Sequence, residues 1–445
     1  MKYQSWGRHP RFIQEGIQLN WRKQSLPDPI NGTKTLLPFG NGRSYGDVCL
    51  NRGGTVLDVR RLNRFISFDQ DNGVLRCESG VLLIDILKLI VPYGWFLPVS
   101  PGTQYVTLGG AIANDVHGKN HHHAGTFGNY VRAFELLRSD GVRHLCNLQE
   151  KENSELFNAT IGGLGLTGLI TWAEIQLRSI NSPMLDEQSI KFSNINEFFQ
   201  ISDDSDKDYE YTVAWIDCMA RNNSLGRGIF SRANHSDKKY IQSKDLKSYK
   251  VDTGAKWNFP ITLPFSLVNN FSVKLFNDYW YGKHRQNLKS FHRHFQSFFY
   301  PLDSVNNWNR IYGSAGMLQY QCVLPGSDGR KMLKNMLEVI ALSGQGSFLA
   351  VAKIFGDQKS PGMLSFPRSG VTLALDFPNS PEVFKLLSRL DEMTTEVSGA
   401  VYPAKDSRMS SKSFNIFYPN WLEFSQYIDP RFSSSFWRRV TSGLI

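Results

Sequence analysis

Two glycine-rich segments in the first third of the chain combine residue types that suit a phosphorylated or flat cofactor. The first reads FGNGRSYGD at 39–47 and follows the apolar run at 35–38. Its glycines allow consecutive N–H groups to point into one concavity, while Arg43 adds positive charge and Ser44 adds a hydroxyl. This combination predicts a site for a pyrophosphate.

The second segment, PGTQYVTLGGAIANDVHGKNHHHAGTFG at 101–128, places six glycines among small residues and histidines. Backbone of this kind can come very close to a flat ligand. At Gly110 we expect a Cβ to collide with the cofactor or with a backbone held at positive φ. Glycine clusters also occur in ordinary loops, so it is the presence of two such segments that favours a cofactor site.

The histidines at 117–123 offer an alternative, a metal site. His117 and His121 have the i,i+4 spacing of zinc ligands on a helix, but no glutamate follows the first of them. Gly118 and Gly125 also disfavour a helix at this point. We therefore predict no metal.

A third glycine motif, GLGLTG at 163–168, matches the dinucleotide fingerprint G-x-G-x-x-G. A Rossmann site needs a strand before the glycines and a helix after them. Here 154–160 is predicted as a helix and 169–177 alternates like a strand, so the order is reversed. We predict no NAD(P) binding at this motif.

The two long glycine segments together resemble the flavin-binding half of the vanillyl-alcohol oxidase superfamily, also called the p-cresol methylhydroxylase type. The motif HGKNHH at 117–122, with the stretches 318–321, 347–353 and 402–408, is similar to the family of decaprenylphosphoryl-ribose 2'-oxidase. The similarity runs in the same order from about residue 6 to about residue 430.

The resemblance implies FAD as cofactor, with 39–47 around its diphosphate and 101–118 along the isoalloxazine. Covalent attachment in the superfamily often uses a histidine in the diphosphate loop, and Arg43 stands at that position, so we expect non-covalent FAD. The implied cofactor-binding residues are Gly40, Asn41, Gly42, Arg43, Ser44, Tyr45, Gly46, Gly102, Thr103, Thr107, Leu108, Gly109, Gly110, Asn114, His117, Gly118, Ile170 and Tyr402.

The catalytic residues implied by the resemblance are Lys405, His117 and Lys353. Lys405 follows Tyr402, which in the family contacts the flavin, and a lysine there can orient a hydroxyl or hold negative charge at the reduced ring. As a base it would need a pKa lowered by several units through burial or a neighbouring cation.

The substrate pocket is expected from residues on strand-like segments. Gln319 and Gln321 alternate and should face the same side. The implied substrate-binding set is Gln321, Gln319, Lys119, Thr372 and Trp215. The family has a cysteine in this pocket where the present chain has Ala374, which puts carry-over of cysteine-directed inhibition in doubt.

The resemblance implies oxidation of a secondary sugar hydroxyl to a keto sugar, with the 2'-hydroxyl of a polyprenyl-phosphoryl pentose as the expected substrate. An NAD(P)H-dependent reductase would then complete an epimerisation in cell-envelope polysaccharide biosynthesis. The first alternative is a sugar-lactone or alditol oxidase acting on a free sugar. The second, of another class, is a basic binding protein without redox activity.

Composition limits the partners and the compartment. The 445 residues carry a formal charge of +10, which suits a phosphorylated substrate, a membrane surface or nucleic acid. No zinc-finger spacing or RNA-recognition motif supports nucleic acid. Five widely spaced cysteines without a CxxC pair indicate a reducing compartment. No secretion signal is visible and charged or proline residues interrupt the apolar stretches 81–99 and 259–276, so we expect a cytoplasmic protein without a spanning helix.

Local patterns indicate an α+β protein. Strands are predicted at 55–59, 65–68 and 74–78, a tight turn at 71–73 and a helix at 81–92. We expect a two-subdomain p-cresol methylhydroxylase-type FAD-binding domain over 1–180 with a C-terminal return at 400–445, and an α+β substrate (cap) domain with an antiparallel sheet over 181–399. The aromatic segment 259–281 is expected to be a lid, a lipid dock for peripheral contact with the inner membrane, or an ordinary packing segment.

Overall fold

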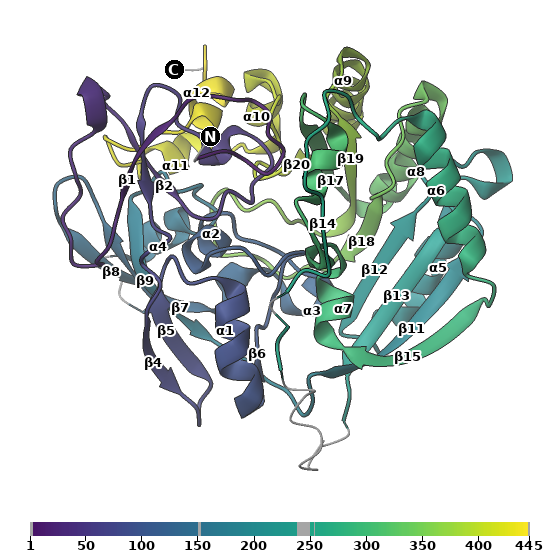
Figure 1. Ribbon diagram of the computed structural model, residues 1–445, viewed down its shortest axis with the longest axis horizontal. Coiled ribbons are helices and arrows are strands. Elements are labelled where there is room, and N and C mark those ends of the chain that lie inside the picture. The colour runs from purple at the N-terminus through teal and green to yellow at the C-terminus, as the bar shows by residue number, and fades with distance from the viewer. Residues whose placement is uncertain (1–2, 150–152, 238–249, 253, 444–445) are drawn as a thin grey trace.

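The structure is a computed structural model that describes residues 3–149, 153–237, 250–252 and 254–443. Helices and mostly antiparallel sheets form the α+β class that the sequence predicts. Figure 1 shows two parts side by side, one formed by both ends of the chain and one formed by its middle.

Two larger sheets build the first part. A parallel sheet has the order β1 (Glu15–Gln18), β3 (Thr55–Asp58), β2 (Leu36–Phe39). An antiparallel sheet has the order β4 (Phe65–Asp69), β5 (Val74–Glu78), β9 (Leu169–Gln176), β7 (Val131–Leu137), β8 (Arg143–Asn147). Helices α1 (Leu83–Ile90), α2 (Leu108–Ala113) and α4 (Ser154–Thr160) accompany them.

The local predictions in this part are confirmed. The three strands at 55–78 form, and Gly73 takes a φ of +64° in the turn between β4 and β5. The apolar side of α1 packs into the core beneath the sheet. Helix α4 precedes the GLGLTG motif and strand β9 follows it, which is the reverse of a Rossmann site.

The second part is built on an eight-stranded antiparallel sheet. Its order is β15 (Leu288–His294), β11 (Met184–Phe192), β13 (Gly228–His235), β12 (Tyr211–Ile216), β18 (Val351–Phe355), β19 (Gly370–Pro378), β17 (Met317–Pro325), β20 (Ala400–Val401). Helices α5 (Ile195–Ser205), α8 (Gly326–Ser343) and α9 (Pro381–Glu396) pack on this sheet, and α6 (Asn270–Lys283) lies on the same outer side in Figure 1.

Alternation along β17 separates a core face from a polar face. Leu318, Tyr320 and Cys322 are buried in the core beneath the helices. Gln319 and Gln321 therefore point to the opposite face, toward the first part of the molecule.

The last helices return to the first part. Helices α10 (Ser411–Phe417), α11 (Trp421–Ser425) and α12 (Ser435–Val440), yellow in Figure 1, lie beside the purple N-terminal segments. The N–H of Leu36 donates to the Arg431 carbonyl at 2.7 Å, and the N–H of Ser433 donates back to the Leu36 carbonyl at 3.0 Å. The two ends of the chain thus build one unit.

Shorter elements complete the described part of the chain. They are β6 (Trp95–Phe96) paired with β10 (Arg178–Ser179), β14 (Trp257–Asn258) paired with β16 (Val305–Asn306), α3 (His121–Ala124), α7 (Phe295–Phe299), and the 3-10 turns η1 (Ile30–Gly32), η2 (Asp47–Cys49), η3 (Val91–Tyr93), η4 (Phe127–Tyr130), η6 (Asn222–Ser224), η7 (Pro301–Ser304) and η8 (Trp308–Tyr312). The five cysteines are all free thiols. Within the described ranges, none of the helices has the length and apolar character that crossing a membrane requires.

Candidate active site

A cavity of about 350 Å³ lies where the two glycine-rich segments meet the polar face of the large sheet. Most of the predicted site residues line it. They are Gly40, Asn41, Gly42, Arg43, Ser44, Tyr45, Gly102, Thr103, Thr107, Gly109, Gly110, Asn114, His117, Ile170, Gln319, Gln321, Lys353, Tyr402 and Lys405.

The first glycine segment leaves β2 and turns at Gly42, whose φ is +60°. A Cβ at Gly40 would lie 2.4 Å from Thr107 Oγ1, so the two glycine segments are in direct contact there. The side-chain amide of Asn41 donates to the Tyr105 carbonyl at 2.8 Å. Glycine is needed at 40 because only its lack of a side chain permits this approach.

The second glycine segment enters α2 through an N-cap. Thr107 Oγ1 accepts from the Gly110 N–H at 3.2 Å. The expectation of positive φ at Gly110 is wrong, because this residue lies inside α2 and is absent from the described positive-φ positions. A Cβ there would meet Thr107 Oγ1 at 2.9 Å, so crowding at the cap is the observed constraint.

Asp115 fixes the end of this segment. Its carboxylate accepts from the Gly128 N–H at 2.8 Å and from the hydroxyls of Ser360 and Ser365 in the loop that follows β18. The segment that carries His117 is therefore tied to the second part of the molecule. Sequence analysis did not identify this role for Asp115.

His117 is buried between the two parts. The Gln321 amide donates to Nε2 of His117 at 2.8 Å, and the ring lies 5.2 Å from the Tyr402 ring. Burial and the nearby Lys353 lower the pKa of His117 well below its ordinary value. The imidazole is then neutral at physiological pH, and with Nε2 accepting, its proton belongs on Nδ1.

The sheet supplies one polar wall of the cavity. Gln319 stands opposite Asp376 across β17 and β19, and Gln321 stands opposite Ala374. Lys353 on β18 donates from Nζ to the Gly118 carbonyl at 3.1 Å. Burial, with help from Lys119 and Lys405, lowers the pKa of Lys353 to about 7.

Lys405 enters the cavity from the loop after β20. Its Nζ lies 4.0 Å from the centre of the Tyr45 ring, and the Tyr45 N–H donates to the Ala404 carbonyl at 2.8 Å. Burial lowers the pKa of Lys405, while the neighbouring Asp376 carboxylate raises it. The loop thus places a partly destabilised cation beside the first glycine segment.

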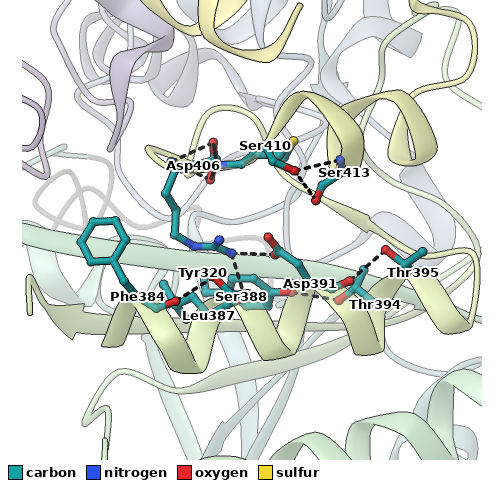
Figure 2. Close-up of polar contacts among 12 residues, drawn as sticks. Tyr320, Phe384, Leu387, Ser388, Asp391, Thr394, Thr395, Asp406, Ser410 and Ser413 are labelled. Carbon is teal, nitrogen blue, oxygen red and sulfur yellow. Dashed lines mark hydrogen bonds and ion pairs between the residues drawn. The ribbon is translucent and has the colours of Figure 1, made fainter. Parts of the chain in front are cut away.

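A buried ion-pair network anchors this loop. Asp391 on α9 pairs with Arg408 at 2.7 Å, and the Asp406 carboxylate accepts from the N–H groups of Arg408 and Met409 (Figure 2). Arg439 of α12 bonds Asp406 at 3.0 Å. The same arginine bonds Asp47, the last residue of the first glycine segment, at 2.7 Å. One network therefore holds both segments that flank the cavity.

Six predicted site residues do not line the cavity: Gly46, Leu108, Gly118, Lys119, Thr372 and Trp215. Nζ of Lys119 donates to the Phe298 carbonyl and lies 4.2 Å from that residue's ring. Thr372 Oγ1 donates to the Cys322 carbonyl at 2.8 Å, and Trp215 Nε1 donates to the Phe348 carbonyl at 2.8 Å.

Gly46 has a packing role next to the cavity. A Cβ there would lie 1.7 Å from the Asp406 carbonyl oxygen, so this glycine lets the first glycine segment approach the Lys405 loop. The absence of a side chain at 46 is required by that contact rather than by the cavity itself.

Two cavity carboxylates were missed by sequence reasoning. Asp376 lies two residues after Ala374 on the same strand, so the period of two would have placed both on one face. Asp303 accepts from Thr103 Oγ1 and the Gln104 N–H, each at 2.8 Å, and no local pattern points to it. Among the residues that the structure describes, no cluster of three or more His, Cys, Asp or Glu side chains could hold a metal.

The cavity presents several polar atoms that have no hydrogen-bond partner within the described part of the chain. They are Arg43 Nε, Ser79 Oγ, Asn114 Oδ1, His117 Nδ1 and Gln319 Oε1. Buried polar atoms are almost always paired in proteins, so this set indicates a polar ligand. A dinucleotide flavin fits these donors and acceptors. Its diphosphate would suit the segment at Arg43, and its ring heteroatoms would suit the segment at Asn114 and His117.

Comparison with known proteins agrees with this cavity. Residues 31–147 match the FAD binding domain family. The chain is 37% identical over 421 residues to decaprenylphosphoryl-beta-D-ribose oxidase of Mycolicibacterium smegmatis, covering 92% of this chain and 90% of that protein. It is 30% identical to an uncharacterized protein in the mprA 5' region of Streptomyces coelicolor, covering 81% and 100%. L-gulonolactone oxidase of Mus musculus is 24% identical over 40% of each chain.

The fold, the cavity and these matches define an FAD-dependent oxidoreductase that acts on a CH–OH group. The match to the Mycolicibacterium enzyme, in both its length and its identity, identifies the family within this class. It belongs to the decaprenylphosphoryl-beta-D-ribose oxidase family, within the vanillyl-alcohol oxidase superfamily, as the motifs indicated.

Proposed function

We propose that the protein oxidises the 2'-hydroxyl of a polyprenyl-phosphoryl pentose to a keto sugar, the first half of an epimerisation. The observation that carries the proposal is the cavity itself, where two flavin-type glycine segments face a wall bearing Gln319, Gln321 and Lys405. Amides and an ammonium group are suited to sugar hydroxyls. The 37% identity to the pentose oxidase supports this substrate class.

The flavin half of the site would be held by the two glycine segments. Residues 39–47 would take the diphosphate and residues 101–118 the isoalloxazine, with Tyr402, whose hydroxyl donates to the Asn114 carbonyl at 2.8 Å, at the ring. When bound, FAD supplies the hydride acceptor.

The catalytic roles fall to groups on this chain. The Lys405 ammonium would orient the substrate hydroxyl and hold the negative charge that develops as its proton passes to water. Neutral His117 would donate from Nδ1 into the cavity, and Lys353 would bind a sugar oxygen. Lys119, Thr372 and Trp215 would act one layer behind the sugar pocket, since they do not line it.

The decisive experiment is anaerobic reduction of the bound flavin by a panel of candidate substrates. A polyprenyl-phosphoryl pentose should bleach the flavin in a single turnover. The panel includes free sugar lactones and alditols because of the partial match to L-gulonolactone oxidase. If one of them reduces the flavin as fast, the alternative function is favoured. Reduction by none of them would refute the proposed substrate class.

We propose that FAD is bound without a covalent link, because Arg43 occupies the usual attachment position. Its guanidinium lies 4.3 Å from the centre of the Trp6 ring and 5.2 Å from that of Tyr105, so it fills the cavity wall. Acid precipitation should leave the yellow cofactor in the supernatant. Flavin that stays with the precipitated polypeptide would contradict this.

A lipid dock is proposed on the segment 257–279. It exposes seven large apolar side chains to at least 41%: Trp257, Ile261, Phe265, Leu267, Phe271, Leu275 and Tyr279. Such a concentration of exposed apolar side chains in one segment supports an interaction site. The Leu267 N–H donates to the Ile311 carbonyl of η8 at 2.8 Å, and Trp308 of the same turn lines the cavity. The segment therefore packs against a turn that lines the cavity.

Paired substitutions test the dock without deleting part of α6. Phe271→Ser with Leu275→Ser should lower turnover of a long-chain substrate and its binding to anionic vesicles, and should spare a short-chain analogue. Leu342→Ser on α8, where the side chain is 71% exposed, is the matched control. Equal losses on the long and short substrates would remove the argument for a dock.

Three wider assignments belong to the same proposal. The flavin domain would comprise 1–180 with the return at 400–445, in two subdomains, and the substrate domain 181–399. The enzyme would act in the cytoplasm, peripherally at the inner membrane. An NAD(P)H-dependent reductase would consume the keto sugar.

A further inference from the structure

The Asp376 carboxylate is fixed in the cavity wall. Its side chain is 1% exposed, and it accepts from the side-chain amide of Gln319, the residue directly opposite on β17. The backbone N–H of Asp376 donates to Ser347 Oγ at 3.0 Å. The strand pairing and these two hydrogen bonds leave the carboxylate little freedom.

Lys405 shares the cavity with this carboxylate, and no ion pair within 4 Å joins the two side chains. The other titratable groups around Lys405 are Tyr45, beneath its Nζ, and the bases Lys353 and His117. Tyr45 is buried and its pKa is raised by burial, so its phenol stays neutral.

Asp376 is the carboxylate available to Lys405. The other described carboxylate that lines the cavity, Asp303, is engaged by Thr103 Oγ1 and the Gln104 N–H. Tyr312, which also faces Asp376, is a buried phenol whose pKa burial raises. Among the residues that the structure describes, Asp376 is thus the acidic side chain that acts on the charge of Lys405.

We propose that Asp376 is a positioning residue that serves as the counter-ion of Lys405 and makes Lys405 a fixed cation rather than a proton acceptor. The part of Asp376 in turnover rests on the proposed function. Its effect on the charge of Lys405 does not. A role is thereby assigned to a residue that lines the same cavity as Lys405 without forming an ion pair with it.

The electrostatics favour this arrangement. Burial disfavours the charged forms of Asp376 and Lys405, and the opposite charge of each partly stabilises the charged form of the other. If Asp376 were absent, burial would lower the pKa of Lys405 with no neighbouring carboxylate to offset it. Lys405 would then lose its proton at a lower pH.

The first test measures Lys405 in the cofactor-free protein, so it is independent of catalysis. Competitive acetylation with acetic anhydride over a pH series, read by mass spectrometry of the peptide containing Lys405, gives the pH at which this amine becomes reactive. Asp376→Asn should lower that midpoint by about one unit or more. An unchanged midpoint would overturn the proposal.

Asp303→Asn is the matched control, because it removes the other cavity carboxylate and should leave the Lys405 midpoint in place. Asp376→Glu keeps the negative charge and should bring the Lys405 midpoint most of the way back to the wild-type value. Should Asp376→Asn fail to fold, Asp376→Ser gives the same test, because it also removes the carboxylate. An unchanged Lys405 midpoint in that variant would refute the counter-ion.

The second test uses the holoenzyme. In Asp376→Asn the alkaline decline in the rate of flavin reduction should move to lower pH, while KM for the sugar changes little. In Asp376→Glu the decline should move back toward the wild-type pH. A uniform loss at every pH would indicate a merely structural role. If the wild-type enzyme reduces its flavin with none of the sugars, the proposed function fails, but the acetylation result still stands.

Discussion

The side chain of Lys405 lies buried beside Tyr45, and its charge is central to the proposed chemistry. Lys405→Ala should keep bound FAD and slow anaerobic flavin reduction by about 10²–10⁴-fold, the usual cost of a lost proton-handling or orienting group. Lys405→Arg should rescue little, because the planar guanidinium fills the pocket differently. A rate within about threefold of wild type, well inside that range, would move the catalytic assignment to His117 or Lys353.

The pH dependence of flavin reduction distinguishes a cation from a base. Burial lowers the pKa of Lys405, so it loses its proton below the ordinary lysine value of about 10.4. If the ammonium is the active form, the rate falls as pH rises through that lowered pKa. If the free amine is active, the rate rises instead. Stopped-flow rates from pH 6 to 10 check the sign, and Lys405→Ala should lack this limb.

Individual site residues could be predicted from the sequence where side chains alternate along a strand. Gln319 and Gln321 were placed on one face by alternation, and both line the cavity. Lys119 could not be placed in this way, because its ammonium binds the Phe298 carbonyl, 179 residues away. A contact of that kind leaves no local pattern. The same is true of Asp303.

The anchor between α9 and the Lys405 loop makes a prediction about an element. Asp391→Asn removes the carboxylate that pairs with the buried Arg408 guanidinium, leaving Asp406 as its remaining acidic neighbour, and should lower the free energy of unfolding by about 3–5 kcal/mol. Urea denaturation measures the change. Glu392→Gln on the exposed side of the same helix is the control, with an expected change within about 0.5 kcal/mol. Equal effects of the two substitutions would show that the anchor carries no stability.

Elements with strong local signals were predicted within one or two residues at most of their ends. Strand β5 follows a turn that needs positive φ at Gly73, and α1 has apolar residues at helical spacing. The order of the large sheet was not predictable in this way. Strand β18 lies between β12 and β19 through pairings such as Ala214 with Ala352, and these join residues distant in sequence.

For the whole molecule, FAD should act as a stabilising ligand that joins its two parts. A ligand that binds only the folded state at about 100 times its Kd adds about 2.7 kcal/mol. The apoprotein should therefore melt at a lower temperature than the holoenzyme, and its Tm should rise with FAD concentration. Riboflavin, which lacks the diphosphate, should shift the Tm less. Identical shifts with both would argue against a diphosphate site at 39–47.

The pairing of both chain ends in one unit also governs when the enzyme can be completed during its synthesis. Asp47 of the first glycine segment meets Arg439 from a position 392 residues later. At about 5–20 residues per second, a ribosome needs roughly 20–80 s to cover that distance. Throughout that interval the nascent first glycine segment lacks its partner. Cofactor loading is therefore expected to follow translation of the last helix, and early-terminated products should emerge colourless.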